Sequence, residues 1–120
     1  MDLFDNDRPI YVQIVESVEQ NIVTGKYKCG DKLPTVRELA SEYKINPNTV
    51  QRSFTELESL GIVKSEGTVG RYVTDDRKII NNLKKNIIHE KIGNFMKDME
   101  TLDISVEETI EFIKSKGERS

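Results

Sequence analysis

The sequence is poor in the residues that build metal and redox sites. It has one cysteine, Cys29, one histidine, His89, and no tryptophan. A single cysteine excludes an internal disulfide, and together with one histidine it is too little for a structural zinc site. We therefore expect no metal and no cofactor. The lone thiol is better explained as a bystander than as an oxidant sensor, and His89 is assigned no role.

Long hydrophobic runs are also missing. No stretch approaches the roughly 20 apolar residues that cross a bilayer, and residues 1–5 lack the basic-then-apolar order of a signal peptide. We expect no membrane partner and a cytoplasmic location. No nucleophile with a base, no paired carboxylates and no metal cluster stands out, so the sequence predicts that the protein is not an enzyme.

The balance of charge is slightly acidic, with a net charge of -3 at pH 7, which argues against nucleic-acid binding for the chain as a whole. The charge is unevenly spread, however. Residues 1–25 hold one basic and five acidic residues, residues 26–73 hold eight and six, and residues 74–120 hold nine and ten. Only the middle segment is basic, so it is the candidate for contact with an anionic partner.

Two helix signals open the chain. Isoleucine or valine recurs every four residues from Ile10 to Ile22, which indicates an amphipathic helix ending at Gly25. A second, short helix is predicted to begin at a capping box formed by Thr35 and Glu38, in which each side chain accepts a hydrogen bond from the other residue's backbone N–H.

A third helix follows almost at once. Asn46 suits its cap and Pro47 its first position, and Gly61 is expected to end it. Apolar side chains at helical spacing are expected to face inward, namely Val50, Phe54, Leu57 and Leu60. Tyr11, Tyr43 and Phe54 are likewise expected in the core. Two helices joined by so short a turn are typical of a helix-turn-helix.

A hairpin and a helical tail complete the expected fold. Residues 62–65 and 71–74 are β-prone and flank a turn with two glycines. An apolar stripe over residues 79–99 and a capping box at Ser105 and Glu108 predict two further helices. The expected fold is mainly α with a small β-hairpin: a winged helix-turn-helix DNA-binding domain over residues 1–75, followed by a two-helix dimerisation tail over residues 76–120.

One copy of the chain cannot bury the whole apolar stripe of its tail. Leaving the stripe in water would be costly, because each exposed CH₂ costs about 0.8 kcal/mol. Pairing with a second copy in a two-fold, four-helix arrangement would cover it. The side chains expected in this homodimer interface are Ile80, Leu83, Ile87, Ile88, Ile92, Phe95, Met99 and Ile110.

Five motifs resemble those of a known family. They are residues 9–14 (PIYVQI), 30–40 (GDKLPTVRELA), 46–50 (NPNTV), 57–63 (LESLGIV) and 70–73 (GRYV). Together they resemble the GntR family of bacterial regulators over residues 9–74, and the short tail is similar to that of the YtrA-like subfamily. The resemblance implies a sequence-specific, double-stranded DNA-binding regulator. It further implies a repressor that acts as a homodimer and controls a transporter operon. The two-fold symmetry of such a dimer favours an inverted-repeat operator. The resemblance does not say whether a small-molecule effector exists.

Residue chemistry and the resemblance together predict the DNA contacts. Arginine suits the guanine edge in the major groove, and asparagine or glutamine suits adenine. The expected DNA-binding residues are Thr35, Arg37, Asn46, Asn48, Thr49, Gln51, Arg52, Thr68, Gly70 and Arg71.

Each of these assignments has a simpler alternative. For Arg37, which falls on the family's helix-two arginine, the alternative is a surface salt bridge with a nearby glutamate. Asn46 suits a plain helix cap, and residues 68–71 suit an ordinary hairpin turn. Glu66 and Gly67 stand where many relatives carry a basic residue near the wing tip. For the whole chain, the alternative is a winged helix that binds proteins instead of DNA.

Overall fold

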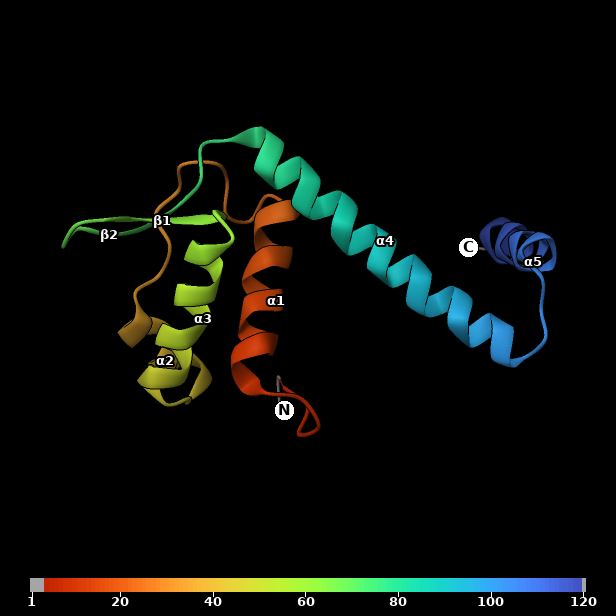
Figure 1. Ribbon diagram of the computed structural model, residues 1–120, viewed down its shortest axis with the longest axis horizontal. Helices are drawn as coiled ribbons and strands as arrows, with labels where there is room; N and C mark the ends of the chain where they lie inside the picture. The colour runs from red at the N-terminus through yellow and green to blue at the C-terminus, as the bar shows by residue number, and fades with distance from the viewer. Residues whose placement is uncertain (1–3, 120) are drawn as a thin grey trace. The chain divides into compact units, whose positions relative to one another are not determined.

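The computed structural model describes residues 4–119. In chain order, these residues form α1 (Ile10–Val23), α2 (Val36–Tyr43), α3 (Pro47–Ser59), β1 (Val63–Glu66), β2 (Gly70–Val73), α4 (Arg77–Thr101) and α5 (Val106–Arg119) (Figure 1). The expected fold class, mainly helical with a small antiparallel hairpin, is confirmed. Residues 1–3 and 120 lie outside the described residues. The prediction that residues 1–5 are not a signal peptide therefore falls mostly outside them.

The chain forms two compact units, Met1–Lys84 and Lys85–Ser120. The sequence predicts the boundary at residues 75–76, before the long helix. The first unit extends further because Ile79, Ile80 and Leu83, from the first turns of α4, pack against its core.

In the first unit, α3 packs against both α1 and α2 (Figure 1). A buried serine helps to seat α3 on α1: the Ser53 hydroxyl lies 3.0 Å from the carbonyl oxygens of both Tyr11 and Thr49. Because the side chain is fully buried, these partners remove the cost of an unpaired hydroxyl. The apolar core comprises Ile14, Val15, Val18, Ile22, Leu33, Leu39, Ala40, Val50, Phe54, Leu57, Ile62, Val63 and Val73.

The caps predicted for α2 and α3 are confirmed. Thr35 and Glu38 make both hydrogen bonds of a capping box, and the Asn46 side chain accepts a hydrogen bond from the backbone N–H of Asn48. One prediction for α3 is wrong. Leu60 was expected in the core but is 51% exposed, because the helix has ended and Leu60 is its C-cap, beyond the last turn that packs inward.

The wing consists of β1 and β2, which pair antiparallel with Val63 opposite Val73 and Glu66 opposite Gly70. A third chain segment joins this hairpin, since Lys32 forms an isolated antiparallel bridge with Tyr72. The loop between α1 and α2 is therefore part of the wing in space, although it precedes the helix-turn-helix in sequence.

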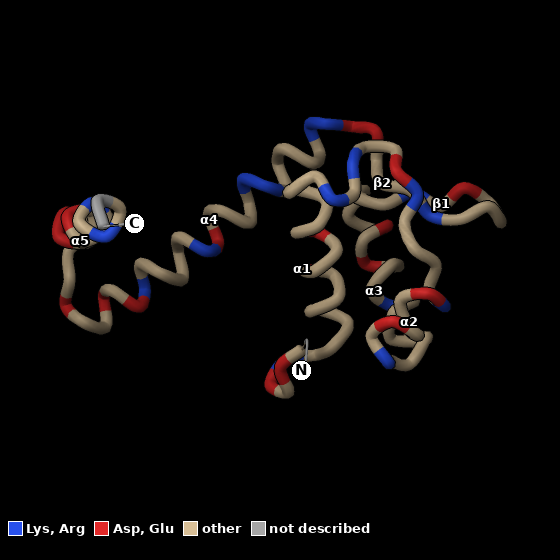
Figure 2. The backbone as a smooth tube through the Cα atoms, turned by 180° about the vertical axis from the view of Figure 1, so that it is seen from behind, with Lys and Arg blue, Asp and Glu red and all other residues tan. Residues whose placement is uncertain are grey.

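The second unit contains the rest of α4 and α5. Its one fully buried side chain among the described residues is Thr109, whose hydroxyl donates to the Ser105 carbonyl oxygen at 2.8 Å. Ser105 also forms the predicted capping contact with Glu108, one of the acidic residues at the start of α5 (Figure 2). Over residues 4–119, none of the helices has both the length and the apolar character of a transmembrane span.

Candidate nucleic-acid interface

Three features of the first unit bring together the residues expected to contact DNA. These features are the start of α2, the polar face of α3 and the hairpin. In Figure 1 the hairpin projects from the end of α3 on the same side of that helix as α2. All three features belong to one compact unit, and both α2 and the hairpin adjoin α3.

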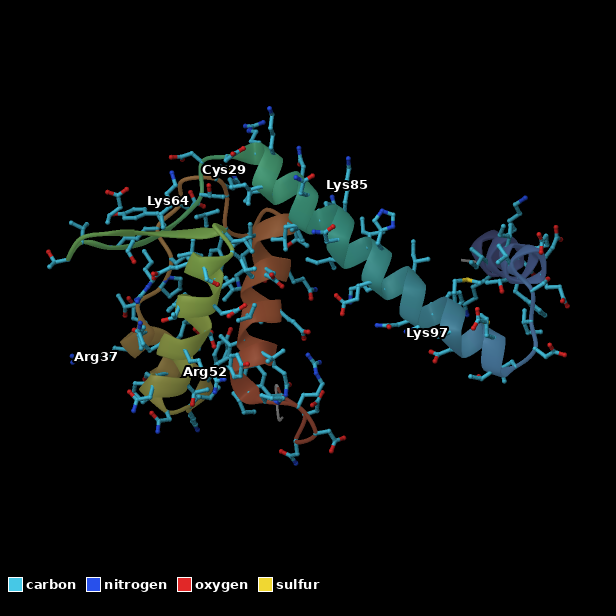
Figure 3. The ribbon with its side chains drawn as sticks, viewed as in Figure 1. Cys29, Arg37, Arg52, Lys64, Lys85 and Lys97 are labelled. Carbon is cyan, nitrogen blue, oxygen red and sulfur yellow. The ribbon has the colours of Figure 1, made fainter. Side chains whose placement is uncertain are left out.

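Arg37 lies in the first turn of α2, between the two residues of the capping box, Thr35 and Glu38. Its side chain is exposed and extends away from the helix (Figure 3). Over residues 4–119 the guanidinium has no hydrogen-bond or ion-pair partner, so the surface salt bridge considered from the sequence is not formed. The five N–H donors of this group are free to bind a ligand.

The polar face of α3 presents short amide and hydroxyl side chains. Asn48 and Gln51 are exposed, and the Gln51 amide makes only a long contact, 3.5 Å, with the Thr55 hydroxyl. Asn46 is committed to its capping bond at 2.8 Å, and Thr49 is half-buried. Asn48 and Gln51 are thus the side chains of this face that can bind base edges without first breaking a strong intramolecular bond.

Arg52 is held differently from Arg37. Its guanidinium carbon lies 3.8 Å from the centroid of the Tyr11 ring, so the cation stacks on an aromatic face supplied by α1. Such stacking fixes the direction of a long side chain and stabilises the contact by about 0.5–1 kcal/mol at an exposed site. Tyr11, expected in the core, is half-buried and forms this platform.

Arg71, on β2, is bound inside the unit. Its Nε donates to Glu58 of α3, and its guanidinium carbon lies 5.1 Å from the Phe54 ring centroid. The Ser65 hydroxyl donates to the same Glu58 oxygen at 2.9 Å. The hydrogen bond from Arg71 lowers the pKa of Glu58 below its ordinary value, and the Ser65 bond lowers it further while burial opposes both.

The wing tip carries little positive charge. Gly67 and Thr68 are exposed in the turn, and the acidic Glu66 is the last residue of β1. Gly70 begins β2 with a φ of +144°, a conformation that side chains rarely adopt. The basic groups on or beside this hairpin are Lys64 of β1, Arg71 of β2 and Lys32 of the neighbouring loop.

Sequence reasoning did not single out Lys32 and Glu58. Glu58 has no signal of its own in the sequence, since its partner Arg71 is on a different element. The sequence does contain a signal for Lys32. Pro34 forces Leu33 into an extended conformation, and an extended segment can pair with the edge of a strand.

Comparison with known proteins decides the family. The family model described as "Bacterial regulatory proteins, gntR family" matches residues 10–73, which span α1 to the end of the wing. The chain belongs to the GntR family. The GntR motifs therefore coincide with the helix-turn-helix and the hairpin described above.

Two relatives from Bacillus subtilis cover the tail as well. This GntR protein is 38% identical to the HTH-type transcriptional regulator YhcF over 112 residues, 93% of each chain. It is 36% identical to the HTH-type transcriptional repressor YtrA over 107 residues, 88% of this chain and 82% of that one. The likeness to YtrA agrees with the subfamily suggested by the short tail.

Solved structures show the same fold. A GntR family transcriptional regulator from Listeria monocytogenes aligns with a TM-score of 0.89 and 41% identity, covering 93% of this chain and 98% of that one. The DNA-binding domain of AraR, solved in complex with operator ORX1, aligns with a TM-score of 0.57 and 27% identity over 60% of this chain and 93% of that domain. This GntR protein is thus a transcriptional regulator and not an enzyme, and DNA binding is favoured over a purely protein-binding role.

Proposed function

We propose that this GntR protein is a cytoplasmic repressor that binds an inverted-repeat DNA operator as a homodimer. One observation carries the DNA-binding part of the proposal. Of the three arginines expected to touch DNA, Arg52 and Arg71 are engaged within the first unit, whereas the exposed Arg37 has no partner among residues 4–119. An arginine left free beside a helix start is suited to bidentate binding of a phosphate or a guanine edge.

The recognition step follows from the geometry of α2 and α3. Arg37 anchors the start of α2, and the exposed Asn48 and Gln51 of α3 enter the major groove and bind base edges. The cap contacts of Thr35 and Asn46 hold the two helix starts in place, which lets the backbone N–H groups there approach the phosphates. Thr49, half-buried, and Thr68, at the wing tip, complete the proposed contacts.

The dimer part of the proposal rests on apolar surface in the second unit. Ile88, Ile92 and Phe95 of α4 are 44%, 52% and 41% exposed. A groove of about 510 Å³ is lined almost wholly by apolar side chains, namely Phe95, Met99, Leu102, Ile104, Phe112 and Ile113, with Thr109 and Lys116. Exposed apolar surface of this extent marks an interaction site, and a second copy offers a complementary, equally apolar face.

The residues proposed for this interface do not contribute equally. Ile80 and Leu83 are half-buried and already pack against the core of the first unit, so less of their surface is left for a partner. Ile87 and Met99 are half-buried, and Ile110 is 45% exposed. We therefore assign the centre of the proposed interface to the second unit, from Ile88 onward.

A two-fold dimer presents two copies of α3, which favours an operator with two inverted half-sites spaced by about one helical turn or a multiple of it. YtrA of Bacillus subtilis is named a repressor, and we extend repression to this chain. Control of a transporter operon, which the subfamily resemblance implies, belongs to the same proposal.

The test is selection of bound duplexes from a randomised DNA library with the full-length protein. We expect a recovered motif with inverted half-sites. Arg37→Ala should weaken binding to the recovered duplex by about 1–3 kcal/mol, whereas Lys97→Ala, the same type of substitution in the tail, should not. If the wild-type protein enriches no sequence and retards no duplex at low salt, the protein-binding alternative replaces this proposal.

A further inference from the structure

The loop before α2 is fastened along β2 by three backbone hydrogen bonds. The N–H of Gly30 donates to the Val73 carbonyl at 3.1 Å, the N–H of Val73 donates to the Asp31 carbonyl at 2.9 Å, and the N–H of Leu33 donates to the Arg71 carbonyl at 2.9 Å. Lys32 lies within this stretch, opposite Tyr72. The position of its backbone is thus fixed by the wing.

The Lys32 side chain runs toward the turn of the hairpin. Its Cε lies 2.9 Å, and its Nζ 3.7 Å, from the point that a Cβ on Gly70 would occupy. Gly70 is two residues nearer to the turn than Tyr72, the bridge partner of Lys32. The lysine stem therefore lies over Gly70, in space that exists only because this residue has no side chain.

The charge of Lys32 is available to a ligand. The residue is exposed, and over residues 4–119 its ammonium has neither a hydrogen-bond partner nor an ion-pair partner. Its three N–H donors can therefore bind an anion without breaking a contact inside the protein.

Arg71 has the opposite arrangement. Successive strand residues point to opposite faces, so Arg71 faces away from the side on which Gly70 and Lys32 meet. Its side chain is only 23% exposed and its charge is matched by Glu58 on α3. Moving the guanidinium onto DNA would cost this ion pair and the contact with Phe54.

We propose that Lys32, beside the exposed Lys64 of β1, provides a contact between the wing and the DNA backbone, and that Arg71 is a positioning residue, which holds the hairpin on α3. This inference rests on the proposed DNA binding. A lysine ammonium on a flexible stem is a point charge suited to a phosphate, not to reading a base. The wing's contribution is then affinity that is independent of sequence.

The experiment measures binding of full-length variants to two probes, the duplex recovered from the library and a random-sequence duplex, over a series of KCl concentrations. Lys32→Gln should weaken both complexes by a similar factor. It should also reduce the slope of log K against log salt by about one, because one fewer phosphate is neutralised. Lys28→Gln, in the same loop but at the end away from the hairpin turn, is the matched control and should keep the wild-type slope.

The outcomes separate this inference from the proposed function. Failure of the wild-type protein to bind either duplex would refute DNA binding itself. Wild-type binding combined with an unchanged slope for Lys32→Gln would overturn the Lys32 assignment, as would a loss confined to the recovered duplex.

The role of Arg71 is tested in the same titrations. Arg71→Gln should keep the wild-type salt slope while lowering the melting temperature of the free protein. Exchanging the charges, with Glu58→Arg and Arg71→Glu together, should recover part of that melting temperature compared with either single change. A slope reduced by about one in Arg71→Gln would show that this arginine contacts a phosphate.

Discussion

The guanidinium of Arg52 stacks on the Tyr11 ring, with 3.8 Å between the guanidinium carbon and the ring centroid. This contact links the polar face of α3 to α1, at the point where the Ser53 hydroxyl also meets the Tyr11 carbonyl. An arginine predicted to contact DNA is thus held by a neighbouring helix, which fixes the direction of its side chain on α3.

The Arg52–Tyr11 contact predicts a measurable coupling. In a double-mutant cycle of Arg52→Ala and Tyr11→Leu, urea unfolding should give a coupling free energy of about 0.5–1 kcal/mol, the size of an exposed cation–π pair. The cycle that pairs Tyr11→Leu with Arg37→Ala is the control and should give none. Additive effects in the first cycle would mean that the stacking adds nothing to stability.

The Glu58–Arg71 pair predicts a pH-dependent stability. The pKa of Glu58 is lowered in the fold, so its ionised form contributes stability above the unfolded-state pKa of about 4.3, and this contribution is lost as the pH falls through the lower folded-state pKa. Glu58→Gln should therefore destabilise the protein by about 1–2 kcal/mol at neutral pH and by less in acid. Thermal unfolding between neutral pH and acid measures this difference.

Glu56→Gln is the matched control for that series. Glu56 is an exposed glutamate of α3 with no side-chain partner among residues 4–119. Its replacement should leave stability nearly unchanged at every pH. If Glu58→Gln behaves in the same way, the ion pair does not stabilise the wing.

The backbone conformation of Lys44 predicts that its replacement by glycine stabilises the protein. Lys44 is the C-cap of α2 and adopts a left-handed conformation, with φ 57° and ψ 48°. That conformation costs a side-chain-bearing residue roughly 1–2 kcal/mol, whereas glycine adopts it freely and loses about 0.5–1 kcal/mol through the extra entropy of its unfolded chain. Lys44→Gly should raise the free energy of unfolding by about 0.5–1 kcal/mol.

Asp103 offers a comparison within the same chain, since it also has a φ of 57°. Aspartate tolerates the left-handed region better than lysine does, because its short polar side chain can hydrogen-bond locally. Asp103→Gly should therefore stabilise the protein less than Lys44→Gly. A loss of stability in Lys44→Gly would indicate that the lysine side chain stabilises the turn by more than its backbone costs.

The proposed dimer predicts a change of mass on one apolar-to-acidic substitution. Ile92 is 52% exposed, so Ile92→Asp leaves the fold of one copy intact but places a charge in the proposed interface. Light scattering coupled to gel filtration should show a shift from dimer to monomer. Affinity for the recovered duplex should fall with it.

Asn94→Asp adds the same charge to an exposed position on α4 without removing apolar surface. It should remain dimeric. A wild-type protein that is monomeric at the same concentration, or an Ile92→Asp variant that stays dimeric with native helix content, would count against the tail interface.

Much of the helical framework could be predicted because its signals are local. The capping box of Thr35 and Glu38 and the Asn46 cap join residues two or three positions apart, so the printed order of residues already contains both partners. Periodic apolar residues likewise predict which face of a helix is buried. Leu60 was misplaced because periodicity does not say where a helix leaves the core.

What the amino-acid sequence determined by itself was the order and type of the elements and the family to which the chain belongs. The tertiary structure alone decided which cations are free. Arg71 donates a hydrogen bond to Glu58, 13 positions away in the sequence. Arg52 stacks on the ring of Tyr11, which belongs to another helix. Lys32 is brought to the hairpin by its bridge with Tyr72. The physical reason is range: caps and helical periods act over a few residues, whereas an ion pair or a stacked cation depends on distances that exist only once the elements have packed.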